Sequence, residues 1–198
     1  MFVEIVGSCA GIIYVWFMIR QSIWCWPASL VYIGASYLVF FNARLYAELA
    51  SHTVFLILTL YGWYVWNAKK KQKTFPVTGL KADVISVLVL LNLALGLIFG
   101  ALLEKYTDNP LPYVDSIIAM MRFTGMWLSA NKKIENWPLW MVVNIISIGM
   151  YFRQHLYIYA ALYVLFFAMA FLGYFSWRRT KLSWLDQNPP ERLPLSLY

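Results

Sequence analysis

The chain is poor in charge. Of its 198 residues only 13% are Asp, Glu, Lys or Arg, whereas 62% are hydrophobic, and the mean hydropathy is +0.62. A soluble domain carries roughly a quarter of charged residues, so this composition excludes an ordinary water-soluble fold. Apolar stretches of about 20 residues, the length at which a helix crosses a bilayer, follow one another along the chain. The composition therefore predicts an all-α polytopic membrane protein.

Cysteine and histidine are scarce as well. Cys9 and Cys25 lie in apolar segments without metal or redox spacing, so we expect neither a disulfide nor a metal site, and no cofactor. The two histidines, His52 and His155, belong to no Ser-His-Asp, HExxH or paired-carboxylate pattern. This leaves an integral membrane enzyme as a remote alternative. The net charge of +7 does not predict nucleic-acid binding, because the cations stand at the ends of apolar segments.

Seven apolar runs predict seven transmembrane helices. They cover residues 3–19, 23–41, 45–66, 84–103, 114–130, 137–152 and 156–177. The first run has neither the basic start nor the small-residue cleavage site of a signal peptide, so we expect it to be retained. Residues 1–183 are predicted to form one transmembrane transporter domain. The Pro-rich residues 184–198 are predicted to be a disordered cytoplasmic tail.

The basic residues predict the orientation of these helices in the bilayer. Of the 16 Lys and Arg residues, twelve follow the first, third, fifth and seventh runs, and Arg122 lies inside the fifth. The remaining three, on the other side, are Arg44, Lys105 and Arg153. Loops rich in Lys and Arg stay in the cytoplasm. We therefore expect a multi-pass protein of the cell inner membrane with its N-terminus outside and its C-terminus in the cytoplasm.

An internal repeat appears when the sequence is shifted by 111 residues. The matched pairs include Trp26-Pro27 with Trp137-Pro138, Gly62 with Gly173, and Trp66 with Trp177. The alternative is chance similarity between apolar helices, which are all built from the same few residue types. The offset predicts two parallel three-helix repeats, 1–70 and 112–181, joined by a linker helix at 80–105. Parallel repeats of this 3+1+3 kind occur in transporters that bind substrate near mid-membrane between the halves.

A polar and aromatic stripe follows one face of the third run and has an equivalent in the seventh. His52, Thr59, Trp63 and Trp66 are spaced 7, 4 and 3 residues apart, which places them on one side of a helix. The alternative for the tryptophans is an aromatic belt at the membrane boundary, and for His52 a structural role. The predicted substrate-binding residues are His52, Thr59, Trp63, Trp66, Trp127, Asn144, Tyr163, Tyr174 and Trp177.

Two isolated polar residues interrupt the later helices. Asn144 stands in the middle of "WMVVNIISIGM", and its amide needs a partner in hydrocarbon, either another helix or a ligand. Arg122 in "MMRFTGMW" is costly to bury and must pair or reach the interface. Asp115, seven residues earlier, shares its helix face but is too distant for a direct contact. We expect Asp115 to line an aqueous vestibule instead.

Several of these segments resemble the PnuC family of vitamin transporters. They are "LYAELASHTVFLILTLYGWYVW", "NKKIENWPLWMVVNIISIGMYF" and "LYIYAALYVLFFAMAFLGYFSW", and the resemblance covers nearly the whole chain. It implies a 3+1+3 fold, a homotrimer, and facilitated diffusion of nicotinamide riboside that a cytoplasmic vitamin kinase makes one-way. Close relatives carry thiamine, and others are linked to riboflavin. The resemblance also implies that Asn144 and the face of Trp63 and Trp66 contact substrate.

The resulting hypothesis is an uptake carrier for a cationic vitamin, nicotinamide riboside first and thiamine as the alternative. Pyridinium and thiazolium rings are flat cations that suit an aromatic cage, and Asn144, His52 and Thr59 could supply the polar contacts. The expected partners are the vitamin and the lipid bilayer. Two positions depart from the family pattern: His52 stands where Gln is expected, and Arg122 where a small or apolar residue is expected. A structural or receptor subunit without a ligand is the third hypothesis.

Overall fold

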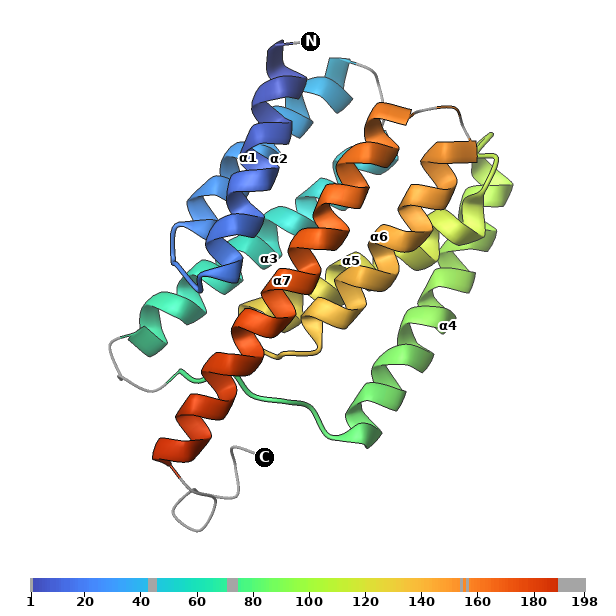
Figure 1. The fold of residues 1–198 in the computed structure, drawn as a ribbon. Coiled ribbons are helices and arrows are strands. Elements are labelled where there is room, and N and C mark those ends of the chain that lie inside the picture. The colour runs from blue at the N-terminus through green and yellow to red at the C-terminus, as the bar shows by residue number, and fades with distance from the viewer. Residues whose placement is uncertain (1, 43–45, 71–74, 154, 156, 189–198) are drawn as a thin grey trace.

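The computed structural model describes residues 2–42, 46–70, 75–153, 155 and 157–188 (Figure 1). In these residues the chain forms seven helices and no strand, which confirms the predicted all-α class. The helices are α1 (Phe2–Ile19), α2 (Cys25–Asn42), α3 (Tyr46–Lys70), α4 (Ala82–Tyr106), α5 (Pro112–Ala130), α6 (Asn136–Arg153) and α7 (Tyr157–Gln187).

The helices suit a bilayer in length and in surface. Three stretches of the described chain are long and apolar enough to cross a membrane by themselves, namely Leu49–Lys69, Ala82–Tyr106 and Tyr157–Gln187. Val6–Ile19 and Cys25–Val39 are shorter apolar helices. On α4, large apolar side chains such as Val87 and Leu90 are more than 60% exposed. Such a continuous apolar surface is unfavourable in water and normal against lipid.

Six of the seven helices end within a few residues of the predicted limits, but α7 does not. It continues to Gln187, ten residues past its predicted end at 177. The prediction ended the helix where the apolar run ends, whereas the sequence has no Gly or Pro until Pro189 to interrupt helical hydrogen bonding. Residues 184–187 are therefore helical rather than part of a disordered tail. Residues 189–198 of the predicted tail lie outside the described residues.

The contacts of the two halves are alike at the offset of 111 residues. The rings of Trp26 and Trp66 meet edge to face at 5.5 Å, and those of Trp137 and Trp177 do so at 5.4 Å. Gln21 and Lys132, also 111 residues apart, have φ angles of 53° and 49°. The Lys132 ammonium donates a hydrogen bond of 3.2 Å to the Gln21 side chain. These paired geometries support the predicted repeat, which stays a prediction.

The main hydrophobic cluster lies at one end of the bundle, where α1, α3 and α5 end and α2 and α6 begin (Figure 1). We call this the closed end. Its centre is formed by the four tryptophans of the two edge-to-face pairs, together with Met18, Met126 and Ala170. Residues 75–80 run beneath the cluster, held by hydrogen bonds from the Thr78 amide to the Lys132 carbonyl and from the Ile134 amide to the Thr78 carbonyl. The tight packing closes this end of the bundle.

Candidate functional site

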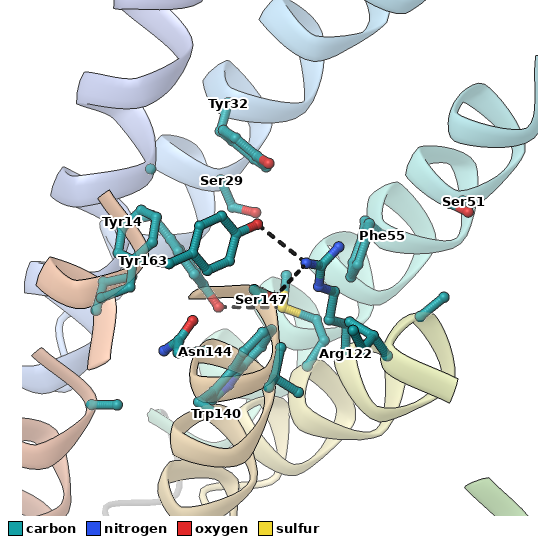
Figure 2. Close-up of a pocket in the computed structure, with 18 of the residues that line it drawn as sticks. Tyr14, Ser29, Tyr32, Ser51, Phe55, Arg122, Trp140, Asn144, Ser147 and Tyr163 are labelled. Carbon is teal, nitrogen blue, oxygen red and sulfur yellow. Dashed lines mark hydrogen bonds between the residues drawn. The ribbon is translucent and has the colours of Figure 1, made fainter. Parts of the chain in front are cut away.

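A cavity of about 370 Å³ lies inside the bundle, between the two predicted repeats (Figure 2). Its described lining comes from α1, α2, α3, α5, α6 and α7, and none of it from α4. Met18, Met126 and Trp137 belong both to the lining and to the cluster at the closed end. From there the lining extends to Asp115 and Tyr151, near the opposite ends of α5 and α6.

One wall of the cavity is polar and is formed by α5, α6 and α7. Arg122 Nη2 donates a hydrogen bond of 3.3 Å to Ser147 Oγ and one of 3.1 Å to the Tyr163 hydroxyl (Figure 2). Asn144 lies one helical turn before Ser147, so the two side chains share a face of α6. Asn144 and Ser147 are almost fully buried. A guanidinium, an amide and two hydroxyls therefore lie together on one wall of the cavity.

The other walls are mostly aromatic. They are formed by Tyr14, Tyr32, Phe55 and Trp140 (Figure 2). Phe166 also belongs to the lining. Each is a flat or elongated apolar surface, and the tyrosines add a hydroxyl. Concave sites with apolar walls and a few placed polar groups are the usual form of a small-molecule site. The cavity therefore suits a flat organic ligand with several polar substituents.

Local packing fixes parts of this wall. Gly125 on α5 faces the indole of Trp140, and a Cβ at this position would lie 3.0 Å from the ring. The absence of a side chain thus lets the Trp140 ring lie directly against α5. Tyr14 donates a hydrogen bond of 3.2 Å to the sulfur of Met126, which ties α1 to α5.

His52 and Ser29 add two more polar groups to the lining. The His52 ring lies 6.1 Å from that of Tyr32 and 5.6 Å from that of Phe55. Ser29 shares a hydrogen bond of 3.0 Å with Thr59, which is fully buried behind it. Thr59 therefore orients a lining hydroxyl and does not line the cavity itself.

Of the nine predicted site residues, His52, Asn144 and Tyr163 line the cavity, and the structure places the others outside it. Trp66 Nε1 donates to the Ala130 carbonyl, and Trp177 Nε1 to the Met18 carbonyl, each at 3.0 Å. Both indoles are buried in the closed end. The stripe is thus divided between the cavity lining and the packed end, and its role in substrate binding stays a prediction. One part of this face of α3 lines the cavity, and the next part packs against the hydrophobic cluster of the closed end. Residue spacing along the helix cannot distinguish these two environments.

The remaining predicted residues also lie away from the cavity lining. Trp63 and Tyr174 are partly buried and pack against the hydrophobic cluster of the closed end. Trp127 is 37% exposed on α5. Asp115 lines the cavity and accepts a hydrogen bond of 2.7 Å from Asn109 Nδ2, and its place in an aqueous vestibule stays a prediction.

Sequence reasoning missed Tyr14, Ser29, Tyr32, Trp140 and Ser147. Ser147 could have been predicted from the sequence, because it lies one turn from Asn144 and is therefore on the same face of the helix. Nothing in the sequence marks the tyrosines and Trp140 as site residues, since aromatic residues in a membrane protein are as common at the lipid interface as in a site.

A half-buried lysine lies beneath the closed end. The ammonium of Lys132, in the loop between α5 and α6, lies 4.7 Å from the ring centroid of Trp66 and 5.0 Å from that of Phe75. Burial lowers the pKa of Lys132 to about 8, because the charged form loses its hydration there. The aromatic faces offset part of that loss by cation–π attraction.

Comparison with known proteins agrees with this geometry. The sequence model of a family described as Nicotinamide mononucleotide transporter matches residues 1–179. The chain is 24% identical to the nicotinamide riboside transporter PnuC of Escherichia coli strain K12, across 88% of this chain and 84% of that protein. It is 25% identical to the riboflavin/roseoflavin transporter RibM of Streptomyces davaonensis, across 88% and 83%.

A solved structure has the same fold. The crystal structure of the vitamin B3 transporter PnuC aligns with a TM-score of 0.74 and 18% identity, across 92% of this chain and 83% of that one. The family match extends over nearly the whole sequence, including every helix that lines the cavity. The chain therefore belongs to the PnuC family and is a multi-pass membrane transporter rather than an enzyme.

Proposed function

We propose that this protein carries an unphosphorylated vitamin with a flat heteroaromatic ring across the inner membrane by facilitated diffusion. The observation that carries the proposal is the partly open cavity of about 370 Å³, with Asn144 beside aromatic walls between the two halves of the bundle. The aromatic walls would bind the ring, and the amide and hydroxyls would bind polar substituents. A cytoplasmic kinase would then phosphorylate the vitamin and make uptake one-way.

Nicotinamide riboside is the candidate that the sequence resemblance favours, and thiamine is its alternative. The carboxamide and ribose hydroxyls of nicotinamide riboside could bond with Asn144 and the lining hydroxyls, while its pyridinium ring lies against the aromatic side chains. We orient the protein with its closed end and C-terminus in the cytoplasm, because most basic residues lie on that side. The cavity would then receive its ligand from the outer side.

Riboflavin is a second candidate, which Arg122 favours. The chain is 24% identical to PnuC and 25% identical to RibM, so sequence identity does not separate the vitamins named for these relatives. Riboflavin has an uncharged ring with carbonyl oxygens, and a guanidinium on the cavity wall can donate to such oxygens.

Calorimetric titration of the purified protein with nicotinamide riboside, thiamine and riboflavin tests the proposal. We expect at least one of them to bind with a micromolar Kd, and binding to be roughly 10- to 100-fold weaker in Asn144→Ala. If none of the three bound the wild-type protein, the proposed function would be wrong. Nicotinamide mononucleotide serves as a phosphorylated control. Trapping requires that it not be carried, so binding as tight as that of nicotinamide riboside would contradict the trapping step.

A further inference from the structure

We propose that the four tryptophans of the closed end act on its opening in two opposite ways. Hydrogen bonds from the indoles of Trp66 and Trp177 stabilise the closed form, whereas the buried indole N–H groups of Trp26 and Trp137 favour opening. The inference rests on the proposed carrier function, because a carrier opens its cavity to each side of the membrane in turn. It does not depend on which vitamin is carried.

Trp66 and Trp177 each bond to the end of a helix in the other predicted repeat. Trp66 Nε1, on α3, donates to the carbonyl of Ala130, the last residue of α5. Trp177 Nε1, on α7, donates to the carbonyl of Met18 near the end of α1. The last carbonyls of a helix have no partner within the helix, so they can accept from a neighbouring helix. Separation of the two repeats at this end would break both bonds.

Trp26 and Trp137, which are related by the offset of 111 residues, have the opposite property. Their side chains are buried, with 0% and 2% of their surface exposed. Both Nε1 atoms are buried without a hydrogen-bond partner among the residues that the structure describes. The combination of one bonded and one unbonded indole therefore occurs in each half. This repetition indicates that it follows from packing that the two halves have in common.

The benzene half of each unbonded indole fixes the side chain within its own repeat. Cζ2, Cη2 and Cζ3 of Trp26 lie against Gly62 on α3, and Cε3, Cζ3 and Cη2 of Trp137 lie against Gly173 on α7. The N–H group belongs to the five-membered ring and takes no part in this contact. Each ring can therefore stay packed on its own repeat when the repeats separate, while its N–H group gains access to water.

The energies of the two kinds of indole have opposite signs. A hydrogen bond between neutral groups stabilises the closed form by a factor of roughly 2 to 10, whereas a buried donor without a partner disfavours it roughly fivefold or more. The face of a neighbouring aromatic ring is only a weak acceptor. Opening lets water bond to the N–H groups and removes this cost. The unbonded indoles therefore limit the stability that the bonded indoles give to the closed form.

Cys25 can report the opening of this end. It belongs to the hydrophobic cluster and is fully buried. Its thiol is close enough to the Lys132 ammonium, in the second predicted repeat, to interact with it electrostatically. The other cysteine of the chain, Cys9, is exposed and would be changed to Ser. In purified Cys9→Ser protein, the rate at which N-ethylmaleimide modifies Cys25 then measures how often the closed end opens.

Replacement of single tryptophans by benzothienylalanine isolates the N–H group. This residue has the shape of tryptophan with a sulfur in place of the N–H, so the packing is kept. At Trp66 or Trp177 we expect modification of Cys25 to become roughly 2- to 10-fold faster, because a bond is lost. At Trp26 or Trp137 we expect it to become roughly fivefold slower. The same replacement at Trp16, which is exposed on α1, is the matched control and should leave the rate unchanged.

The rate on denatured protein corrects for any change in the intrinsic reactivity of Cys25, which matters for the adjacent Trp26. An unchanged or faster rate after replacement of Trp26 or Trp137 would overturn the inference, because their N–H groups would then have a partner such as an ordered water. An unchanged or slower rate after replacement of Trp66 or Trp177 would overturn it as well. The measurement uses no vitamin, so its failure leaves the proposed function intact. Failure of the proposed function shows separately in the titration above.

Discussion

Asn144 is the residue at which the sequence and the structure agree most closely. An amide in an apolar helix needs a polar partner, and the structure places it on the cavity wall among aromatic side chains. Truncation removes both the donor and the acceptor. We expect Asn144→Ala to weaken vitamin binding by roughly 10- to 100-fold, the effect of losing one or two hydrogen bonds in a desolvated site. Calorimetric titration measures this directly.

Asn92 provides the control for that experiment. It is a buried asparagine of α4 that donates to the Leu88 carbonyl and accepts from Thr124, and it lies outside the cavity lining. Asn92→Ala should lower the temperature of unfolding and leave the Kd unchanged. If both variants weakened binding equally, Asn144 would act through the stability of the bundle and not through the ligand.

The tryptophans show where residue-level prediction from sequence reaches its limit. Trp66 and Trp177 were expected in the site because they share a face with polar residues, yet they donate to backbone carbonyls in the closed end. Spacing along a helix fixes which side chains share a face. It does not fix what lies opposite that face, which depends on how six helices cross. The lining residues Ser29 and Trp140 were missed for the same reason.

At the scale of helices, the apolar runs predicted all seven elements because each run is long, continuous and bounded by polar residues. The exception was the end of α7, where the helix continues beyond its apolar run to Gln187. Contacts between helices were harder to predict, and the repeat at the 111-residue offset stays a prediction that the similar packing of Trp26 and Trp137 supports. The paired tryptophans and glycines of the two halves now allow a direct test of that packing.

Gly62 and Gly173 permit close contact between helices. A Cβ on Gly62 would lie 2.1 Å from the Trp26 ring, and one on Gly173 would lie 2.4 Å from the Trp137 ring. Both rings are fully buried, so they have little room to shift. We expect Gly62→Ala and Gly173→Ala each to lower the free energy of unfolding by about 1–3 kcal/mol. Thermal or denaturant unfolding in detergent would measure this.

Gly34 and Gly149 are matched controls in α2 and α6. A Cβ at either position would meet no atom within 4 Å. Alanine at these sites should be neutral, or stabilising by up to about 1 kcal/mol through its higher helix propensity. Equal effects at all four glycines would show that backbone propensity, and not contact with tryptophan, determines the outcome.

Lys132 predicts a dependence of stability on pH. Its pKa is about 8 in the folded protein against an ordinary value of 10.5, so the unfolded chain binds more protons between these two values. The contribution of Lys132 to the free energy of unfolding is therefore largest above about pH 10.5. It decreases as the pH falls below 10.5 and is lost by about pH 8. Relative to Lys132→Met, we expect the Tm of the wild-type protein to rise as the pH increases from 7.5 to 10.

Lys105→Met, at the opposite end of the bundle, is the control for general effects of removing a lysine. Its Tm should follow that of the wild-type protein across the same pH range. A constant difference between wild type and Lys132→Met at every pH would mean that Lys132 is not desolvated beneath the closed end.

At the scale of the whole molecule, two hydrogen bonds join the predicted repeats at the closed end. Trp66 joins α3 to the last residue of α5, and Trp177 joins α7 to the end of α1. Each bond therefore connects one predicted repeat to the other. Under the proposed orientation, release of a ligand into the cytoplasm would require these two contacts to separate, whereas α4 packs against α5 outside the described cavity lining. The arrangement suits a carrier in which the two halves rock against each other.

The central claim is that this protein binds a vitamin in its cavity and carries it across the membrane down its concentration gradient. The most direct measurement is uptake of radiolabelled riboflavin and nicotinamide riboside into proteoliposomes that contain the purified protein and no kinase. We expect at least one of them to equilibrate without accumulating, at a rate unchanged by a protonophore and reduced roughly 10- to 100-fold in Asn144→Ala. Accumulation above the external concentration driven by a proton gradient, or full uptake by Asn144→Ala, would contradict the account.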